Sequence, residues 1–117
     1  MDRVHKNDPR GAQFHEYVMG DLPAEIPGVT SRAMFGGYGI YKNGVIFAII
    51  AEGRLYFRVG QTNKPDYEKR GSKPFTYTSP SGKKITMEYW ELPEEIMEDK
   101  DAIREWVEKS VAASKGK

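Results

Sequence analysis

Residues 39–59 read GIYKNGVIFAIIAEGRLYFRV, three apolar runs separated by two short turns. An Asn-Gly pair at 43–44 parts the first two runs, and both residue types tolerate the positive φ of a type I′ turn, the strongest short-range sign of a β-hairpin. A Glu-Gly pair at 52–53 opens a second hairpin. The stretch therefore predicts three consecutive antiparallel strands. The middle strand, VIFAIIA (45–51), is apolar throughout, as is typical of a strand covered on both faces.

Immediately before and within the first strand, MFGGYGIY (34–41) places three glycines in four positions. Glycine loses more backbone entropy on folding than any other residue, so this cluster indicates a bend or a close approach that a side chain would forbid. We expect Gly36 and Gly37 to bend the chain into the first hairpin, and Gly39 to let a neighbouring bulky ring lie against bare backbone. A dinucleotide-binding fingerprint is not met, because Lys42 replaces its third glycine and a strand follows instead of a helix.

Upstream of the strands, the sequence predicts a helix with Asp8 as N-cap and Pro9 at its first position. We expect the helix to end around Leu22 and Pro23, because two prolines bracket the following segment PAEIPG (23–28). Its apolar stripe is expected to consist of Phe14, Tyr17, Val18 and Leu22.

Downstream, the pattern predicts a short helix over about 64–70, ended by Gly71, and then two strands over 74–78 and 83–92. A helical turn and a longer helix capped near Asp99 follow. The apolar stripe of the longer helix is Ile103, Trp106, Val107 and Val111.

The order of elements, α-β4-α-β2-α, contains no alternating parallel βαβ units and predicts a single α+β domain over residues 1–117. We expect two layers, a mostly antiparallel sheet with helices on one face. The segments 1–8 and 114–117 are expected to be flexible.

Composition excludes several classes of protein. The chain is 38% hydrophobic and 30% charged, as ordinary globular domains are, and it has no cysteine for disulfides or thiolate chemistry. Its longest apolar run is far shorter than the ~20 residues of a membrane helix, and the N-terminus shows no secretory signal, so we expect a cytoplasmic protein without a membrane partner.

Charge is unevenly distributed along the chain. Residues 54–84 contain eight basic and two acidic residues, whereas 85–109 contain nine acidic and three basic ones. A basic stretch can attract nucleic acid, but an acidic segment of equal and opposite charge can also pair with it inside the fold. We favour the internal pairing because the net charge is only +1, and keep nucleic-acid binding through 54–84 as the alternative.

Catalytic and metal-binding groups are sparse, and we predict no catalytic residue, no metal and no cofactor. The histidines, His5 and His15, are expected to be solvated and lack the i, i+4 spacing of a helical metal site. No serine lies in a G-x-S-x-G elbow. A small hydrolase or isomerase remains a lesser alternative, which would require His15 beside a buried carboxylate in a closed pocket.

The sheet face opposite the helices can be interpreted in two ways. It could stack nucleic-acid bases on aromatic side chains beside a guanidinium. Alternatively a partner covers it, since the central strand would otherwise leave an apolar strip in water, and a homodimer joined through sheet faces or edges would provide that cover. The stacking surface would consist of Tyr41, Tyr56, Arg58 and Trp90, and the apolar strip of Ile46, Ala48 and Ile50.

Four segments together resemble the N-terminal domain of the TfoX/Sxy family of bacterial competence regulators: SRAMFGGYGIYKNGVIFAII (31–50), RLYFRV (54–59), PFTY (74–77) and MEYWELPEEIMED (87–99). The resemblance covers roughly residues 14–113, and its most specific part is R-x-M-F-G-G-x-G, which begins at Arg32. It implies a two-layer architecture like that of secretion chaperones. It also implies a regulator that promotes transcription of DNA-uptake genes by working with a DNA-bound activator.

Regulators of this family carry a second, helical domain after the first, whereas the present sequence stops at Lys117, so we expect a stand-alone domain. We expect it to act without catalysis, by binding a protein partner such as a transcription activator. The residues predicted to form the binding surface are Arg32, Met34, Phe35, Gly36, Gly37, Arg58 and Trp90.

Overall fold

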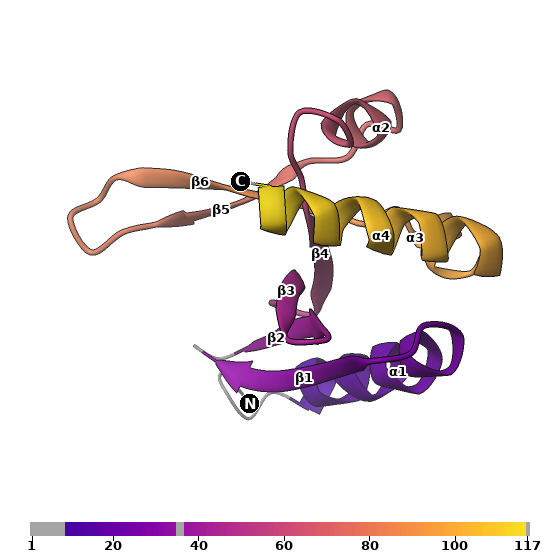
Figure 1. Ribbon diagram of the computed structural model, residues 1–117. Coiled ribbons are helices and arrows are strands. Elements are labelled where there is room, and N and C mark those ends of the chain that lie inside the picture. Colours follow the sequence, from indigo (N-terminus) through magenta and orange to yellow (C-terminus); the bar gives the residue numbers. More distant parts are fainter. Residues whose placement is uncertain (1–8, 35–36, 117) are drawn as a thin grey trace.

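One antiparallel sheet of six strands organises the computed structural model, which describes residues 9–34 and 37–116 (Figure 1). The strands are β1 (Val29–Met34), β2 (Gly37–Lys42), β3 (Val45–Ala51), β4 (Arg54–Arg58), β5 (Pro74–Thr78) and β6 (Lys84–Glu91). Their order across the sheet is β1-β2-β3-β4-β6-β5, so β6 pairs with β4 and β5 becomes an edge strand. The predicted antiparallel sheet is confirmed.

Helices cover one face of this sheet. Those described are α1 (Pro9–Glu25), α2 (Lys64–Lys69), α3 (Glu94–Met97) and α4 (Lys100–Gly116). α4 packs across β3 and β4, and α1 packs beside β1 (Figure 1). Apolar residues of both helices join the same buried cluster as residues of the central strands, so both lie on one face. The α+β class and its two layers follow from this arrangement.

The hydrophobic core lies between α1, α4 and the sheet. Phe47 and Phe57 meet edge to face with ring centroids 5.4 Å apart, and Tyr67 of α2 packs in the same way on Trp106 of α4. Further members of the core are Val18, Leu22, Ile40, Ile103 and Val107.

Local turn chemistry behaves as the sequence predicts. Asn43 and Gly44 have φ of 50° and 85°, and Glu52 and Gly53 have 56° and 73°, so both hairpins use turns with two positive-φ residues. Gly71 follows α2 with φ of 74°. The side chain of Asp99 caps α4 by accepting hydrogen bonds from the N–H groups of residues 101 and 102 at 3.1 and 3.0 Å.

The first helix is longer than predicted. α1 begins at Pro9, as expected, but continues through Pro23 to Glu25, although proline removes one helical hydrogen bond. Leu22 and Ile26 are both buried, and the N–H of Ile26 donates to the carbonyl of Leu22, so core packing holds the last turn in place. The proposed N-cap, Asp8, lies outside the described residues, as do His5 and the bend at 35–36.

Two further expectations about helices differ from the structure. Tyr17, which we placed on the apolar stripe of the first helix, is 46% exposed. α4 runs on to Gly116, so residues 114–116, which we placed in a frayed tail, are helical. The hydroxyl of Ser114 donates a hydrogen bond to the carbonyl of Ile46, which ties this end of α4 to β3.

A β-bulge changes which side chains of β3 face the helices. Across the β2–β3 pair, Ile40 lies opposite Ala48 but Tyr41 lies opposite Ile46, so Phe47 is an extra residue on β3. Phe47, Ala48 and Ile50 are buried, whereas Ile46 and Ile49 are only half-buried. The prediction that β3 is covered on both faces is wrong, and the proposed strip is divided: Ala48 and Ile50 belong to the core and Ile46 to the other face.

Strong twist makes the sheet concave on the face without helices. β1 and the β5–β6 hairpin stand at opposite ends of the strand order, yet both project to the left in Figure 1. Successive strands rotate by roughly 20–25° in one sense, and the rotation accumulates across the sheet. The hairpin and the end of β1 therefore flank a common space, and we call this side of the sheet the open face.

Candidate functional site

An aromatic cluster lies on the open face, on strands β4, β5 and β6. The rings of Tyr56 and Phe75 are 5.1 Å apart between centroids, and Phe75 stacks on Tyr77 at 6.0 Å. Tyr56 and Tyr89 are buried but do not belong to the core under the helices. The sheet thus carries a second apolar cluster, whose assembly from three strands the sequence does not predict.

Two hydroxyls of this cluster, those of Tyr56 and Tyr89, have raised pKa values. Burial raises the pKa of Tyr56, and the charge of Glu91 adds to that rise. Burial also raises the pKa of Tyr89, while the nearby Arg58 guanidinium, 5.8 Å from the ring centroid, acts in the opposite direction. Neither tyrosine is therefore prepared to act as a base or nucleophile near neutral pH.

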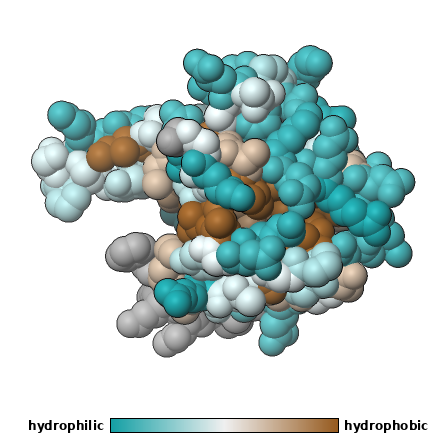
Figure 2. All heavy atoms as spheres, viewed as in Figure 1, coloured by the Kyte–Doolittle hydropathy of each residue, from teal (hydrophilic) through white to brown (hydrophobic). Residues whose placement is uncertain are grey.

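A hollow of about 620 Å³ lies beside this cluster, between the hairpin and the first three strands. One wall is formed by side chains of β1 and β3, including Met34, Ile46 and Ile49. The opposite wall is formed by side chains of the hairpin, including Phe75, Tyr77 and Met87. Figure 2 shows hydrophobic side chains reaching the surface in the middle of the molecule, below the projecting hairpin. Glu52 is the one charged residue among the described residues that line the hollow.

Glycines give this wall its shape. A Cβ placed on Gly37 would overlap the carbonyl oxygen of Ile50 on β3, and one placed on Gly39 would collide with the side chain of Met34. The methyl end of Met34 therefore lies closest to the bare backbone of Gly39, where we expected an aromatic ring, and a ring atom of Tyr41 lies next to it. The φ of Gly37 is not positive, so close approach of the backbone, and not a left-handed bend, requires glycine at that position.

The predicted binding residues are only partly brought together. Met34 and Gly37 line the hollow, and Arg58 lies over Tyr89 beside it. Arg32 is exposed on the same face, with its guanidinium 5.8 Å from the ring centroid of Tyr41. Phe35 and Gly36 lie outside the described residues.

Trp90 does not belong to the open face. It pairs across the strands with Phe57, a core residue, and packs against the core on the helix side. The ammonium of Lys64 from α2 lies 5.8 Å from its ring centroid. The expected stacking surface with Tyr41, Tyr56 and Arg58 is therefore wrong for Trp90, because alternation along β6 sends it to the opposite side from Tyr89.

Charge pairing between the basic and acidic parts of the sequence is seen directly. Arg54 pairs with Glu91 at 3.2 Å, and Arg70 pairs with Glu95 at 3.0 Å. Asp66 of the basic stretch in turn pairs with Lys109 at 3.2 Å. Exposed pairs of this kind add little stability, but they leave fewer cations for phosphates.

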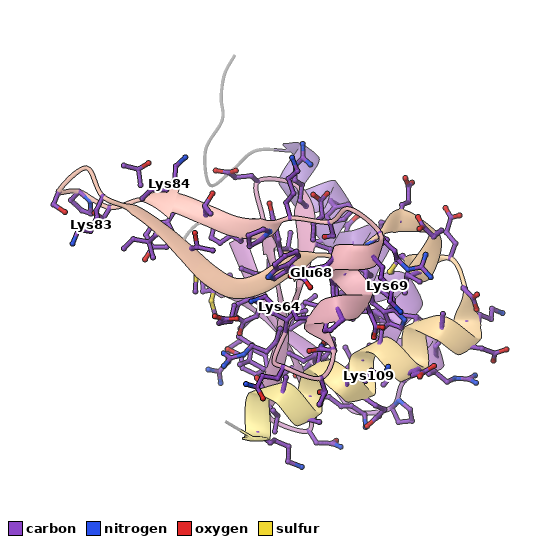
Figure 3. All side chains as sticks on the ribbon, turned by 90° about the horizontal axis from the view of Figure 1, so that it is seen from above. Lys64, Glu68, Lys69, Lys83, Lys84 and Lys109 are labelled. Atoms are coloured by element: carbon purple, nitrogen blue, oxygen red, sulfur yellow. The ribbon has the colours of Figure 1, made fainter. Side chains whose placement is uncertain are left out.

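The remaining lysines do not form one basic surface. Lys83 and Lys84 lie at the free end of the hairpin, far from Lys64 and Lys69 on α2 (Figure 3). Nucleic-acid binding is typically supported by a continuous basic stripe or patch. The described surface therefore favours the protein-contact interpretation of the open face.

His15 is not solvated, contrary to expectation. Its ring stacks on Tyr38 with centroids 3.7 Å apart, and its Nε2 lies 2.8 Å from the hydroxyl of Ser31. Partial burial lowers the pKa of His15, although the negative charge of Glu16 acts to raise it. No carboxylate is buried among the described residues, so the His15–carboxylate pair required by the enzyme alternative is not found there. His15 instead ties α1 to β1 and β2.

Two further observations concern the described part of the chain. No three His, Asp or Glu side chains in it gather closely enough to hold a metal ion. No helix in residues 9–34 and 37–116 is long and apolar enough to cross a membrane.

Comparison with known proteins places this fold in a family. The model of the TfoX N-terminal domain matches residues 21–114, which include all six strands and most of α4. The chain belongs to the TfoX N-terminal domain family. The resemblance seen in the sequence is thereby confirmed.

A curated relative of this TfoX-family domain is the DNA transformation protein TfoX1 of Aliivibrio fischeri (strain ATCC 700601 / ES114). The two are 31% identical over 73 residues. That alignment includes 62% of the present chain but only 34% of the relative, so the match spans about a third of the relative's length.

Proposed function

We propose that this TfoX-family domain is a regulatory module that acts by binding another protein, in a process related to DNA uptake, and that its contact surface is the open face of the sheet. The function is not catalytic, and the ultimate partner is a transcription activator. Family membership and the name of the A. fischeri relative support the process.

The observation that carries the mode of action is the apolar hollow that the described residues leave uncovered. Exposed apolar patches rimmed by polar residues mark contact sites, because leaving them in water costs free energy. This hollow combines methionine and aromatic side chains, the residue types enriched at protein interfaces, with Arg58 beside it. Its described lining contains no paired acid and base of the kind that catalysis requires.

Two adjacent residues of β6 provide the test. Met87 is half-buried in the hollow, whereas Thr86 is exposed on the opposite side of the strand. In a naturally transformable strain whose own copy is deleted, we expect Met87→Glu to reduce transformation frequency at least tenfold. Thr86→Glu should preserve it. Thermal unfolding of both purified variants establishes that they fold, and equal transformation by two folded variants would contradict the proposal.

A further inference from the structure

The β5–β6 hairpin is an arm with one apolar face. Phe75, Tyr77 and Met87 lie on the open face, while Thr76 and Thr86 are exposed on the other side. No described helix packs extensively on either strand of the arm, and Tyr77 is 44% exposed. A two-stranded hairpin gains little stability alone, so an apolar face on such an arm is expected to pack against another surface.

The same open face also contains the hollow into which an arm of this chemistry would fit. Met34, Ile46 and Ile49 form a wall opposite the hairpin, across about 620 Å³ of space. A projecting apolar arm and an apolar hollow therefore lie side by side on one surface. A two-fold dimer contact uses one patch twice and requires that patch to be self-complementary, which this combination of shapes satisfies.

The arm and the hollow also carry opposite charges. Lys83 and Lys84 lie exposed at the free end of the arm (Figure 3), and neither forms an ion pair with any described residue. Glu52 lines the hollow on the β3 side, is also exposed, and lacks an ion-pair partner within the described chain. Each copy thus offers unpaired cations on its arm and an unpaired anion beside its hollow.

We propose that the open face binds a second copy of this chain, with the hairpin of each copy in the hollow of the other. Lys83 and Lys84 of one copy then face Glu52 of the second copy. The inference rests on the proposed function of the open face as a protein contact and names the protein that binds there.

Reversing the charges on the arm and beside the hollow tests this arrangement. The mass of the particle in solution is measured by light scattering and analytical ultracentrifugation at about 1 to 100 µM protein. The unmodified chain should give a dimer in this range. Lys83→Glu with Lys84→Glu should weaken dimerisation about 5- to 10-fold, as should Glu52→Lys, since exposed ion pairs contribute modestly. Combining all three changes should restore most of the lost affinity. Lys69→Glu with Lys115→Glu, two exposed lysines on helices α2 and α4, should have no effect.

A second variant tests the apolar part of the contact. Because Tyr77 is 44% exposed, Tyr77→Asp should fold normally yet weaken the dimer at least tenfold. A monomer at every concentration would overturn the proposal, and so would a dimer indifferent to both the charge reversals and Tyr77→Asp. A monomer whose transformation activity still depends on Met87 would refute the second copy and leave the proposed function standing. A dimer whose transformation activity is unchanged by Met87→Glu would refute the proposed function and leave the contact between two copies standing.

Discussion

Gly37 lies against the carbonyl oxygen of Ile50 on the neighbouring strand, so closely that a side chain at position 37 would overlap it. The contact joins the start of β2 to the end of β3, where the wall of the hollow begins. The shape of the open face therefore depends on backbone proximity that glycine alone permits.

Replacing Gly37 with alanine should lower the free energy of unfolding by about 1–3 kcal/mol, the usual cost of forcing extra atoms into a packed site. Gly20 in α1 provides a matched control, because a Cβ there meets nothing within 4 Å. Gly20→Ala should raise stability by about 0.5–1 kcal/mol through helix propensity. Urea unfolding of both variants measures the difference, and a Gly37→Ala protein as stable as the parent would contradict the close approach.

Stability should fall as the pH is lowered through the range of His15. Its pKa is lowered in the folded state from an ordinary value of about 6.5, so the unfolded chain binds the proton more readily. Stability is unaffected well above 6.5 and decreases below it, as the unfolded state gains the proton first.

Denaturant unfolding between pH 5 and 8 tests whether stability falls in this direction. His15→Gln should flatten the decline below pH 6.5, and a proton NMR titration of the parent should place the His15 pKa below its ordinary value of about 6.5. If the parent and His15→Gln lose stability in parallel as the pH falls, the packing of His15 on Tyr38 and Ser31 has been assigned wrongly.

Asp99 should stabilise α4 by capping its first turn. Asp99→Ala removes the acceptor for the two N–H groups at 101 and 102 and should cost about 1 kcal/mol. Asp101 lies in the same turn with its side chain 98% exposed, and Asp101→Ala should cost less. Thermal unfolding distinguishes the two, and the reverse order of melting temperatures would refute the cap.

Nucleic acid should bind weakly or not at all. Arg54 and Arg70 are paired with acidic residues, and Lys83 and Lys84 at the free end of the hairpin lie far from Lys64 and Lys69 on α2. Fluorescence anisotropy with short single- and double-stranded DNA and RNA at about 50 mM salt should show no binding below 10 µM protein. Tight binding that weakens steeply with added salt would instead support the basic-stretch alternative.

Sequence predicts this fold well where one or two residues decide the local geometry. The pairs at 43–44 and 52–53 specify their turns because their positive φ is intrinsically accessible. Asp99 is recognisable as a cap because a carboxylate satisfies nearby N–H groups irrespective of the rest of the fold. Such features require no knowledge of distant contacts.

The errors arise where distant contacts decide. Pro23 should end a helix, but burial of Leu22 and Ile26 in the core carries α1 past it. The extra residue Phe47 changes which side chains of β3 face the helices, and only its pairing with β2 reveals the bulge.

The same limitation applies to the candidate site. Alternation correctly groups Phe75 with Tyr77, and Met87 with Tyr89, on one face of each strand. It does not reveal that β6 inserts between β4 and β5, that the sheet twists into a concave surface, or that the described helices leave this face open. Met34 and Gly37 were predicted as site residues, whereas the hollow they line required the tertiary structure.

The most direct test of the open face as a protein contact is photo-crosslinking inside the native cell, with a photoreactive phenylalanine analogue at position 77 or, in a parallel strain, at 76. Both positions lie on the exposed edge strand β5, and only Tyr77 faces the hollow. The account predicts a discrete protein adduct from position 77 and none from 76. No adduct at 77, equal adducts from both positions, or an adduct to nucleic acid would contradict it.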